Sequence, residues 1–229
     1  MEQLNNGFTL DIPAGAFPLS TDSIALANFV RLKRNARILD LGAGCGTLGL
    51  LLCAADPGCA VTGVELDPIA HAAALENIQR NCLGSRMGSI CADLRRIPEL
   101  LPPGQFSCCV SNPPYFSGGP ASRTVPTARR EDCCTMEELF RSAAWALKYG
   151  GDFYLVHRPE RLAELCACAV GNGLEPKRLG LLRHRADGPV ALILVSCRKG
   201  AKPGLTWEEI CLFDDAGNPT EAYRQMYHT

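Results

Sequence analysis

The sequence has no apolar run long enough to cross a bilayer and no recognisable leader. Charged residues, glycine or proline interrupt every apolar stretch well before the ~18 residues that a membrane span requires. The N-terminus, Met1-Glu2-Gln3-Leu4, lacks the basic and apolar regions of a signal peptide. We therefore expect a cytoplasmic protein with no membrane partner.

Metal-ligand spacing is also absent, although cysteine is abundant. None of the 13 cysteines belongs to a Cys-x-x-Cys pair, and the four histidines are scattered. A zinc site needs closely spaced ligands. Many of the cysteines lie in apolar runs, so buried or idle thiols in a reducing compartment are the simpler interpretation. The sequence predicts no metal.

The chain has almost no net charge, and its value of −1 gives no global argument for a nucleic-acid partner. Basic residues are nevertheless concentrated between residues 176 and 202, where seven lysines and arginines stand against Asp187 alone. Such a segment suits phosphate contacts, and it equally suits a charged sheet edge that discourages aggregation. The pattern leaves both open.

What is present is an alternation of apolar strands and amphipathic helices. Strands are expected at 37–41, 60–65, 89–92, 106–110 and 152–157, with helices between them and a glycine pair, Gly150-Gly151, ending the helix before the last of these strands. Two further strands near 178–182 and 190–197 should pair antiparallel. The pattern predicts an α/β fold with a doubly wound, mostly parallel, Rossmann-like sheet of seven strands.

A length of 229 residues suits one well-buried domain. We expect a lead-in and helix over 1–36, a catalytic core over 37–200 and a tail over 201–229. Within the core, residues 112–135 form a loop that is long for a compact α/β unit, and long loops of this kind are commonly functional.

The first strand runs into a glycine turn, Asp-x-Gly-x-Gly-x-Gly at residues 40–46. Glycines there let the backbone approach a bound cofactor, and Glu65 at the end of the second strand could hold ribose hydroxyls. The segment Gly44 to Gly49 also matches the dinucleotide fingerprint, with an acid about 20 residues on. The glycines alone therefore leave open S-adenosylmethionine and a nicotinamide dinucleotide.

The most informative motif is Asn112-Pro113-Pro114-Tyr115, after the fourth strand. A planar exocyclic amine is a poor nucleophile, and the Asn112 side-chain oxygen and the Pro113 carbonyl are two acceptors for its hydrogens. The proline pair stiffens the backbone that presents them. Tyr115 offers a face on which a nucleobase could stack, worth about 1–3 kcal/mol.

Together with an acid before the glycines, this motif favours S-adenosylmethionine and predicts methyl transfer to an amino group. Asp40 is placed to interact with the amino end of the methionine part. Asp93, at the end of the third strand, is placed to accept a hydrogen bond from the adenine amine.

With these residues, the sequence resembles the class I S-adenosylmethionine-dependent methyltransferases that act on exocyclic amines. Within them it is similar to the bacterial enzymes that methylate N6 of an adenine beside the anticodon of valine tRNA. The likeness rests on segments 20–27, 40–46, 64–67, 92–93, 112–115, 128–131 and 219–224. It implies a tRNA partner, and we expect a monomer.

The resemblance also implies roles for individual residues. The catalytic residues would be Asn112, Pro113, Pro114 and Tyr115. The cofactor would be bound by Thr21, Asp22, Asp40, Gly42, Ala43, Gly44, Gly46, Glu65, Leu66, Asp93, Leu94 and Asn112. The tRNA would be contacted by Tyr115, Phe116, Arg129 and Arg130.

Three other functions use some of the same features. A protein glutamine N5-methyltransferase could employ the same tetrad, but such enzymes usually carry a helical domain before the glycine turn, where fewer than 40 residues precede Asp40 here. A noncatalytic RNA-binding protein could keep the fold without turnover. A nicotinamide oxidoreductase could use the glycine turn.

Overall fold

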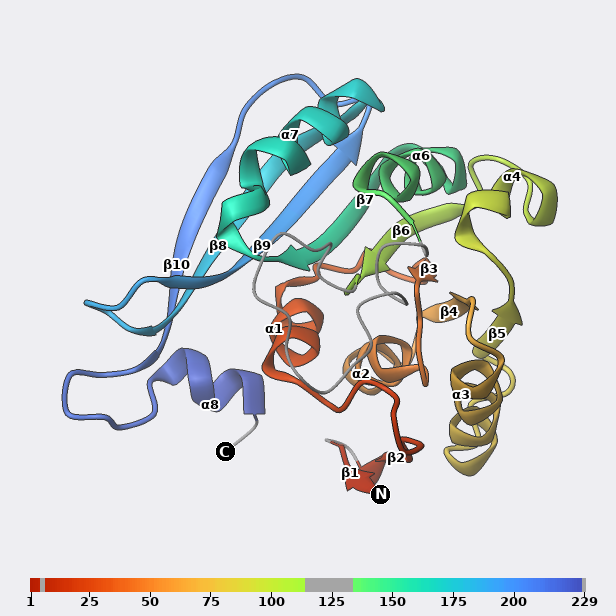
Figure 1. Ribbon diagram of the computed structural model, residues 1–229, viewed down its shortest axis with the longest axis horizontal. Helices are drawn as coiled ribbons and strands as arrows, with labels where there is room; N and C mark the ends of the chain where they lie inside the picture. Colours follow the sequence, from red (N-terminus) through yellow and green to blue (C-terminus); the bar gives the residue numbers. More distant parts are fainter. Residues whose placement is uncertain (5–6, 114–133, 228–229) are drawn as a thin grey trace.

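The computed structural model describes residues 1–4, 7–113 and 134–227, and Figure 1 shows a central twisted sheet with helices on both of its faces. The sheet has eight strands in the order β10-β8-β9-β7-β6-β3-β4-β5. Strand β9 runs antiparallel to its neighbours β7 and β8, and the other pairs are parallel. The strands are β3 (Arg37–Leu41), β4 (Ala60–Glu65), β5 (Met87–Cys91), β6 (Phe106–Ser111), β7 (Leu147–His157), β8 (Leu174–Arg185), β9 (Val190–Lys199) and β10 (Thr206–Phe213).

Helices pack on both faces because the central strands are apolar on both sides. Along β3, Ile38 belongs to one buried cluster and Leu39 to the other, as the alternation of side chains in a strand requires. One cluster lies against α1 (Thr21–Phe29), α2 (Thr47–Ala55) and α3 (Pro68–Arg80), and the other against α4 (Ile97–Leu100), α6 (Met136–Ala146) and α7 (Leu162–Gly171). Short 3₁₀ turns, η2 (Leu94–Arg96) and η3 (Pro159–Arg161), precede α4 and α7. The predicted doubly wound α/β class is confirmed.

Two details differ from the sequence-based prediction. Helix α6 ends at Ala146 and β7 begins at the next residue, so Gly150-Gly151 lies inside a strand and does not end a helix. Gly150 has φ +72°, and the pairing of β6 with β7 shifts register there, so the glycines form an irregularity within the strand. The tail contributes an eighth strand, β10, and a helix, α8 (Glu221–Tyr227).

The N-terminal residues form a short antiparallel pair, β1 (Glu2–Gln3) with β2 (Thr9–Leu10), which is attached to α3 by side-chain amides. Asn81 Oδ1 accepts from Thr9 N at 2.8 Å, and Asn81 Nδ2 donates to Thr9 O at 2.7 Å. Asn77 Oδ1 likewise accepts from Asp11 N at 2.8 Å, and Asn77 Nδ2 donates to Asp11 O at 2.9 Å. The same nitrogen also donates to Cys45 O at 3.0 Å. The fully buried Asn77 amide therefore connects the N-terminal segment to the glycine turn. None of the helices described is both long and apolar enough to cross a membrane.

Candidate active site

The glycine turn lies between β3 and α2 and depends on backbone conformations that favour glycine. Gly42, Gly44 and Gly46 have φ values of +75°, +54° and +84°. A Cβ on Gly46 would lie 2.9 Å from the Met87 methyl carbon, so this residue is constrained by both conformation and space. A Cβ on Gly42 or Gly44 would meet no atom of the described residues within 4 Å. At these two positions the backbone of the turn is therefore not covered by the part of the chain that the structure describes.

Glu65 braces this turn from the end of β4. Its Oε2 accepts from Gly44 N at 2.7 Å, and its Oε1 accepts from Asp67 N at 2.8 Å. Each carboxylate oxygen can accept more than one hydrogen bond. Glu65 can therefore hold the turn and still accept from ribose hydroxyls. Ala43 N donates to the carbonyl of Val64, the residue before Glu65, and Leu66, the residue after it, is exposed.

Asp40 is buried near the end of β3. Among the described residues, neither of its carboxylate oxygens has a hydrogen-bond partner. Burial, together with the nearby Glu65 carboxylate, raises the pKa of Asp40 to about 7, which the Gly49 backbone N–H opposes. A buried carboxyl of this kind is suited to a cationic ligand group, which would favour its ionised form.

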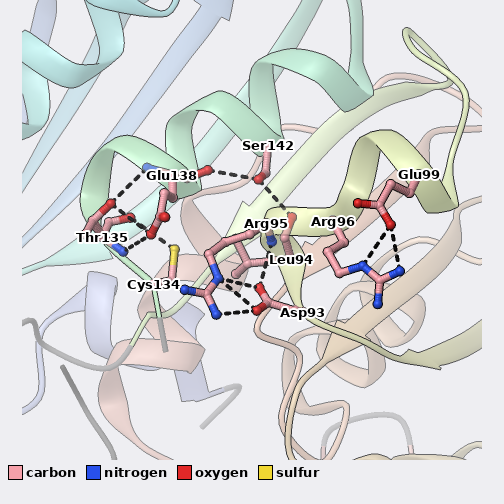
Figure 2. A network of polar contacts seen from close by, with 9 residues as sticks. All are labelled: Asp93, Leu94, Arg95, Arg96, Glu99, Cys134, Thr135, Glu138 and Ser142. Carbon is pink, nitrogen blue, oxygen red and sulfur yellow. Dashed lines mark hydrogen bonds and ion pairs between the residues drawn. The ribbon is translucent and has the colours of Figure 1, made fainter. Parts of the chain in front are cut away.

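Asp93 caps the N-terminus of η2, after β5, and is hydrogen-bonded by Arg95, a residue that the sequence did not single out. Its Oδ1 accepts from Arg95 N at 2.9 Å, and the Arg95 guanidinium Nε donates to Oδ2 at 2.8 Å. This pairing lowers the pKa of Asp93 and keeps it ionised. Figure 2 shows the Arg95 side chain between Asp93 and Cys134, and shows Leu94 joined to α6 through Ser142, whose hydroxyl donates to Leu94 O at 2.9 Å.

Asn112 directly follows β6 and is half-buried, with Pro113 buried beside it. Its Nδ2 donates to the hydroxyl of Ser23 on α1 at 3.0 Å, and Ser23 is itself buried. Sequence reasoning missed Ser23, because 89 residues separate the two partners.

The start of α1 carries the other residues predicted for the cofactor. Thr21 shares a hydrogen bond of 3.0 Å between its hydroxyl and that of Tyr227 on α8. Burial raises the pKa of Asp22, opposed by the positive charge of Arg158. Sequence reasoning also missed Tyr227, which lies in the tail.

The sheet topology explains why these residues meet. Strands β4 and β6 lie on opposite sides of β3, so the order of connection reverses there. Ligands of open α/β sheets bind outside the carboxyl ends of the strands at such a switch point. Asp40, Glu65, Asp93 and Asn112 all lie at or just beyond those ends. Pro114, Tyr115, Phe116, Arg129 and Arg130 lie outside the described residues.

The basic segment 176–202 is mostly occupied in contacts within the sheet. Arg178 pairs with Glu208 at 2.6 Å, and Arg198 with the buried Asp152 at 2.7 Å. Lys199 donates to Leu147 O at 2.8 Å. These contacts favour the structural interpretation of the segment over a free phosphate-binding surface.

Comparisons with known proteins agree with this geometry. Residues 19–165 match the model of the methyltransferase small domain family. The chain is 32% identical over 184 residues to a tRNA1(Val) (adenine(37)-N6)-methyltransferase of Bacteroides fragilis, covering 79% of this chain and 77% of the relative. A protein of the same name from Photobacterium profundum is 26% identical over 214 residues, covering 92% and 89%.

Solved structures share the fold. A crystal structure of a "predicted O-methyltransferase" from Agrobacterium tumefaciens superposes with a TM-score of 0.77 at 24% identity, covering 91% of this chain and 96% of that one. A geranyl diphosphate C-methyltransferase from Streptomyces coelicolor, crystallised with S-adenosyl-L-homocysteine, superposes with a TM-score of 0.59 at 12% identity, covering 77% and 79%.

Proposed function

Because the chain belongs to the methyltransferase small domain family, whose members use S-adenosylmethionine, we propose that it methylates N6 of an adenine beside the anticodon of valine tRNA. The observation that carries the proposal is Asn112, held at the end of β6 beside the glycine turn, at the switch point of the sheet. The family assignment disfavours the nicotinamide oxidoreductase. The names of the relatives favour an RNA acceptor over a protein one.

The residues present fit the cofactor. An added Cβ on Gly42 or Gly44 would meet no described atom within 4 Å, which lets a ligand approach the backbone of the turn. The buried carboxyl of Asp40, which has no hydrogen-bond partner among the described residues, suits a ligand ammonium group. Asp40 and the N–H groups of the turn would hold the amino acid end. Glu65 would accept from the ribose hydroxyls, and Asp93 and Leu94 would border the adenine. Thr21, Asp22 and Leu66 would complete the site.

When bound, S-adenosylmethionine supplies a methyl group that is already activated on a sulfonium. The protein then needs mainly to align the acceptor and exclude water. The Asn112 Oδ1 and the Pro113 carbonyl would accept the two hydrogens of the adenine amine and direct its nitrogen. Tyr115, aided by Phe116, would stack on the base after it leaves its neighbours, which is easier in a tRNA loop than in a duplex.

Arg129 and Arg130 would bind phosphates of the tRNA backbone. Such contacts supply affinity without reading the nucleotide sequence. A surface salt bridge with Glu131 or Asp132 is the alternative role for this pair. We further propose a monomeric cytoplasmic enzyme that forms a single domain.

The test is transfer of labelled methyl from S-adenosylmethionine to tRNA that lacks its own modifications, followed by nucleoside analysis. N6-methyladenosine in valine tRNA is the expected product, and the Asn112→Ala variant is the matched control that should yield none. Label absent from RNA, despite measurable binding of S-adenosylmethionine, would refute the tRNA substrate and point to a protein glutamine amide. Absence of both binding and transfer would revive the noncatalytic RNA-binding protein.

A further inference from the structure

We propose that Asn77 is a positioning residue for the cofactor turn, through which docking of the N-terminal segment, here residues 7–12, and binding of S-adenosylmethionine strengthen each other. The inference rests on the proposed cofactor site and does not depend on which amine accepts the methyl group. Its basis is a set of three hydrogen bonds made by the Asn77 amide, which joins α3, the N-terminal segment and the glycine turn.

The orientation of the Asn77 amide is fixed by its partners, because all three are backbone groups that can only donate or only accept. Oδ1 accepts from the N–H of Asp11 at 2.8 Å, and Nδ2 donates to the carbonyls of Asp11 at 2.9 Å and Cys45 at 3.0 Å. Both hydrogens of Nδ2 are therefore committed. A rotated amide would set its nitrogen against an N–H and its oxygen against two carbonyls. The side chain is fully buried, so water does not replace a lost partner.

The Cys45 carbonyl belongs to the peptide between Cys45 and Gly46, within the glycine turn. The N–H of the same peptide, on Gly46, donates to Ala43 O at 2.9 Å, so this peptide is held at both of its polar ends. Glycine allows many backbone conformations, and the turn therefore depends on such contacts to keep one of them. Loss of the Asn77 donor would leave a buried carbonyl without its partner, and a rearrangement of the turn would relieve that cost.

The N-terminal segment has a second attachment that does not involve the turn. Asn81 holds Thr9 by hydrogen bonds of 2.8 and 2.7 Å, and among the described residues its side chain makes no hydrogen bond to the turn. The amide of Asn77 bonds both the segment and the turn. A cofactor that favours the ordered turn also favours the Asn77 position that orders it. Because such coupling is reciprocal, the bound cofactor should hold the segment more tightly.

The first test measures cofactor affinity by calorimetry on the full chain. We expect Asn77→Ala to raise the Kd for S-adenosylmethionine at least tenfold, equivalent to about 1.4 kcal/mol. Asn81→Ala is the matched control, because it also removes two hydrogen bonds to the segment, and its Kd should stay within twofold of wild type. With unmodified tRNA and saturating S-adenosylmethionine, kcat of Asn77→Ala should stay within twofold of wild type. An unchanged Kd in Asn77→Ala, or an equal rise in both variants, would overturn the proposal.

The second test measures hydrogen exchange of the Thr9 amide, whose partner Asn81 is present in both wild type and Asn77→Ala. Saturating S-adenosylmethionine should slow this exchange at least fivefold in wild type and less than twofold in Asn77→Ala. The Asp214 amide, which donates to Asn218 O at 2.9 Å in the tail, should respond in neither protein.

An unchanged Thr9 exchange rate in wild type, or the same slowing in Asn77→Ala, would overturn the proposal. If Asn77→Ala does not fold, the comparison of wild type with and without cofactor decides. Failure of wild type to bind S-adenosylmethionine would instead refute the proposed cofactor site, and failure to methylate tRNA would refute the proposed substrate. The three failures are therefore distinguishable.

Discussion

Replacing Asp40 by asparagine should stabilise the protein at alkaline pH and weaken its binding of S-adenosylmethionine. The carboxyl is buried at the end of β3, and among the described residues neither of its oxygens has a hydrogen-bond partner. Asparagine has nearly the same shape and no ionisable group. The substitution therefore removes the cost of ionisation while leaving the packing almost unchanged.

The magnitude follows from the pKa of Asp40, which burial and the Glu65 carboxylate raise from 3.8 to about 7. At about 1.4 kcal/mol per pH unit, ionising Asp40 in the folded protein costs up to about 4 kcal/mol. Between pH 3.8 and 7 Asp40 is protonated in the folded state and ionised in the unfolded state. The free energy of unfolding therefore falls as the pH rises through this range. The cost is about 1.7 kcal/mol at pH 5 and reaches nearly its full value of about 4 kcal/mol at pH 8.

The assay is urea unfolding of wild type and Asp40→Asn at pH 5 and pH 8. We expect the variant to be more stable than wild type by about 1.7 kcal/mol at pH 5 and by about 4 kcal/mol at pH 8, so that the difference grows by about 2–3 kcal/mol between the two pH values. Asp93→Asn is the matched control, because Arg95 lowers the pKa of Asp93 and keeps this carboxylate ionised at both pH values. The effect of Asp93→Asn on the free energy of unfolding should therefore be the same at pH 5 and pH 8. Asp40→Asn with the same effect on stability at both pH values would refute the reasoning.

Three further predictions concern the turn and the tetrad. Gly46→Ala should lower the free energy of unfolding by at least about 1–2 kcal/mol, because φ is +84° and Met87 would have to move. The loss should exceed that in Gly42→Ala, whose new methyl group would meet no described atom within 4 Å. Equal losses of unfolding free energy in the two variants would contradict a steric clash with Met87. Asn112→Ala should abolish turnover while calorimetry finds the affinity for S-adenosylmethionine within severalfold of wild type, and a parallel loss of both would contradict a role toward the acceptor. Tyr115→Ala should lower the methylation rate more than Tyr115→Phe, because the ring face is the stacking surface, and the opposite order would argue against stacking.

Sequence reasoning found the central sheet because its strands are buried on both faces and therefore read as nearly continuous apolar runs. Strand β10 escaped notice because it is an edge strand, and its first four residues, Thr206 to Glu209, are exposed. The boundary between α6 and β7 was misplaced because a glycine pair is the usual signal for the end of a helix, whereas Gly150 here provides an irregularity within the strand. Local composition does not distinguish these two uses.

In the candidate site, too, the sequence revealed local motifs but did not reveal the contacts between residues that are distant in the chain. The glycine turn and Asn112 are local motifs whose chemistry can be read from adjacent residues. The pairing of Asp93 with Arg95 spans only two residues, but no pattern distinguished Arg95 from the neighbouring Arg96. The contact of Ser23 with Asn112 depends on packing α1 against the end of β6, and a single sequence carries no signal for it.

The attachment of the N-terminal segment to α3 has a consequence for how the protein is made. Thr9 emerges from the ribosome first, yet its partner Asn81 lies 72 residues further along the chain. At about 5–20 residues per second, several seconds pass before that partner is synthesised. The segment must wait, undocked, until α3 has formed. Its docking brings Asp11, whose carbonyl accepts from the Asn77 amide and whose N–H donates to it, while the same amide donates to Cys45 O in the glycine turn. A contact beside the cofactor site of a nascent chain is therefore completed by residues that were synthesised well before their partner.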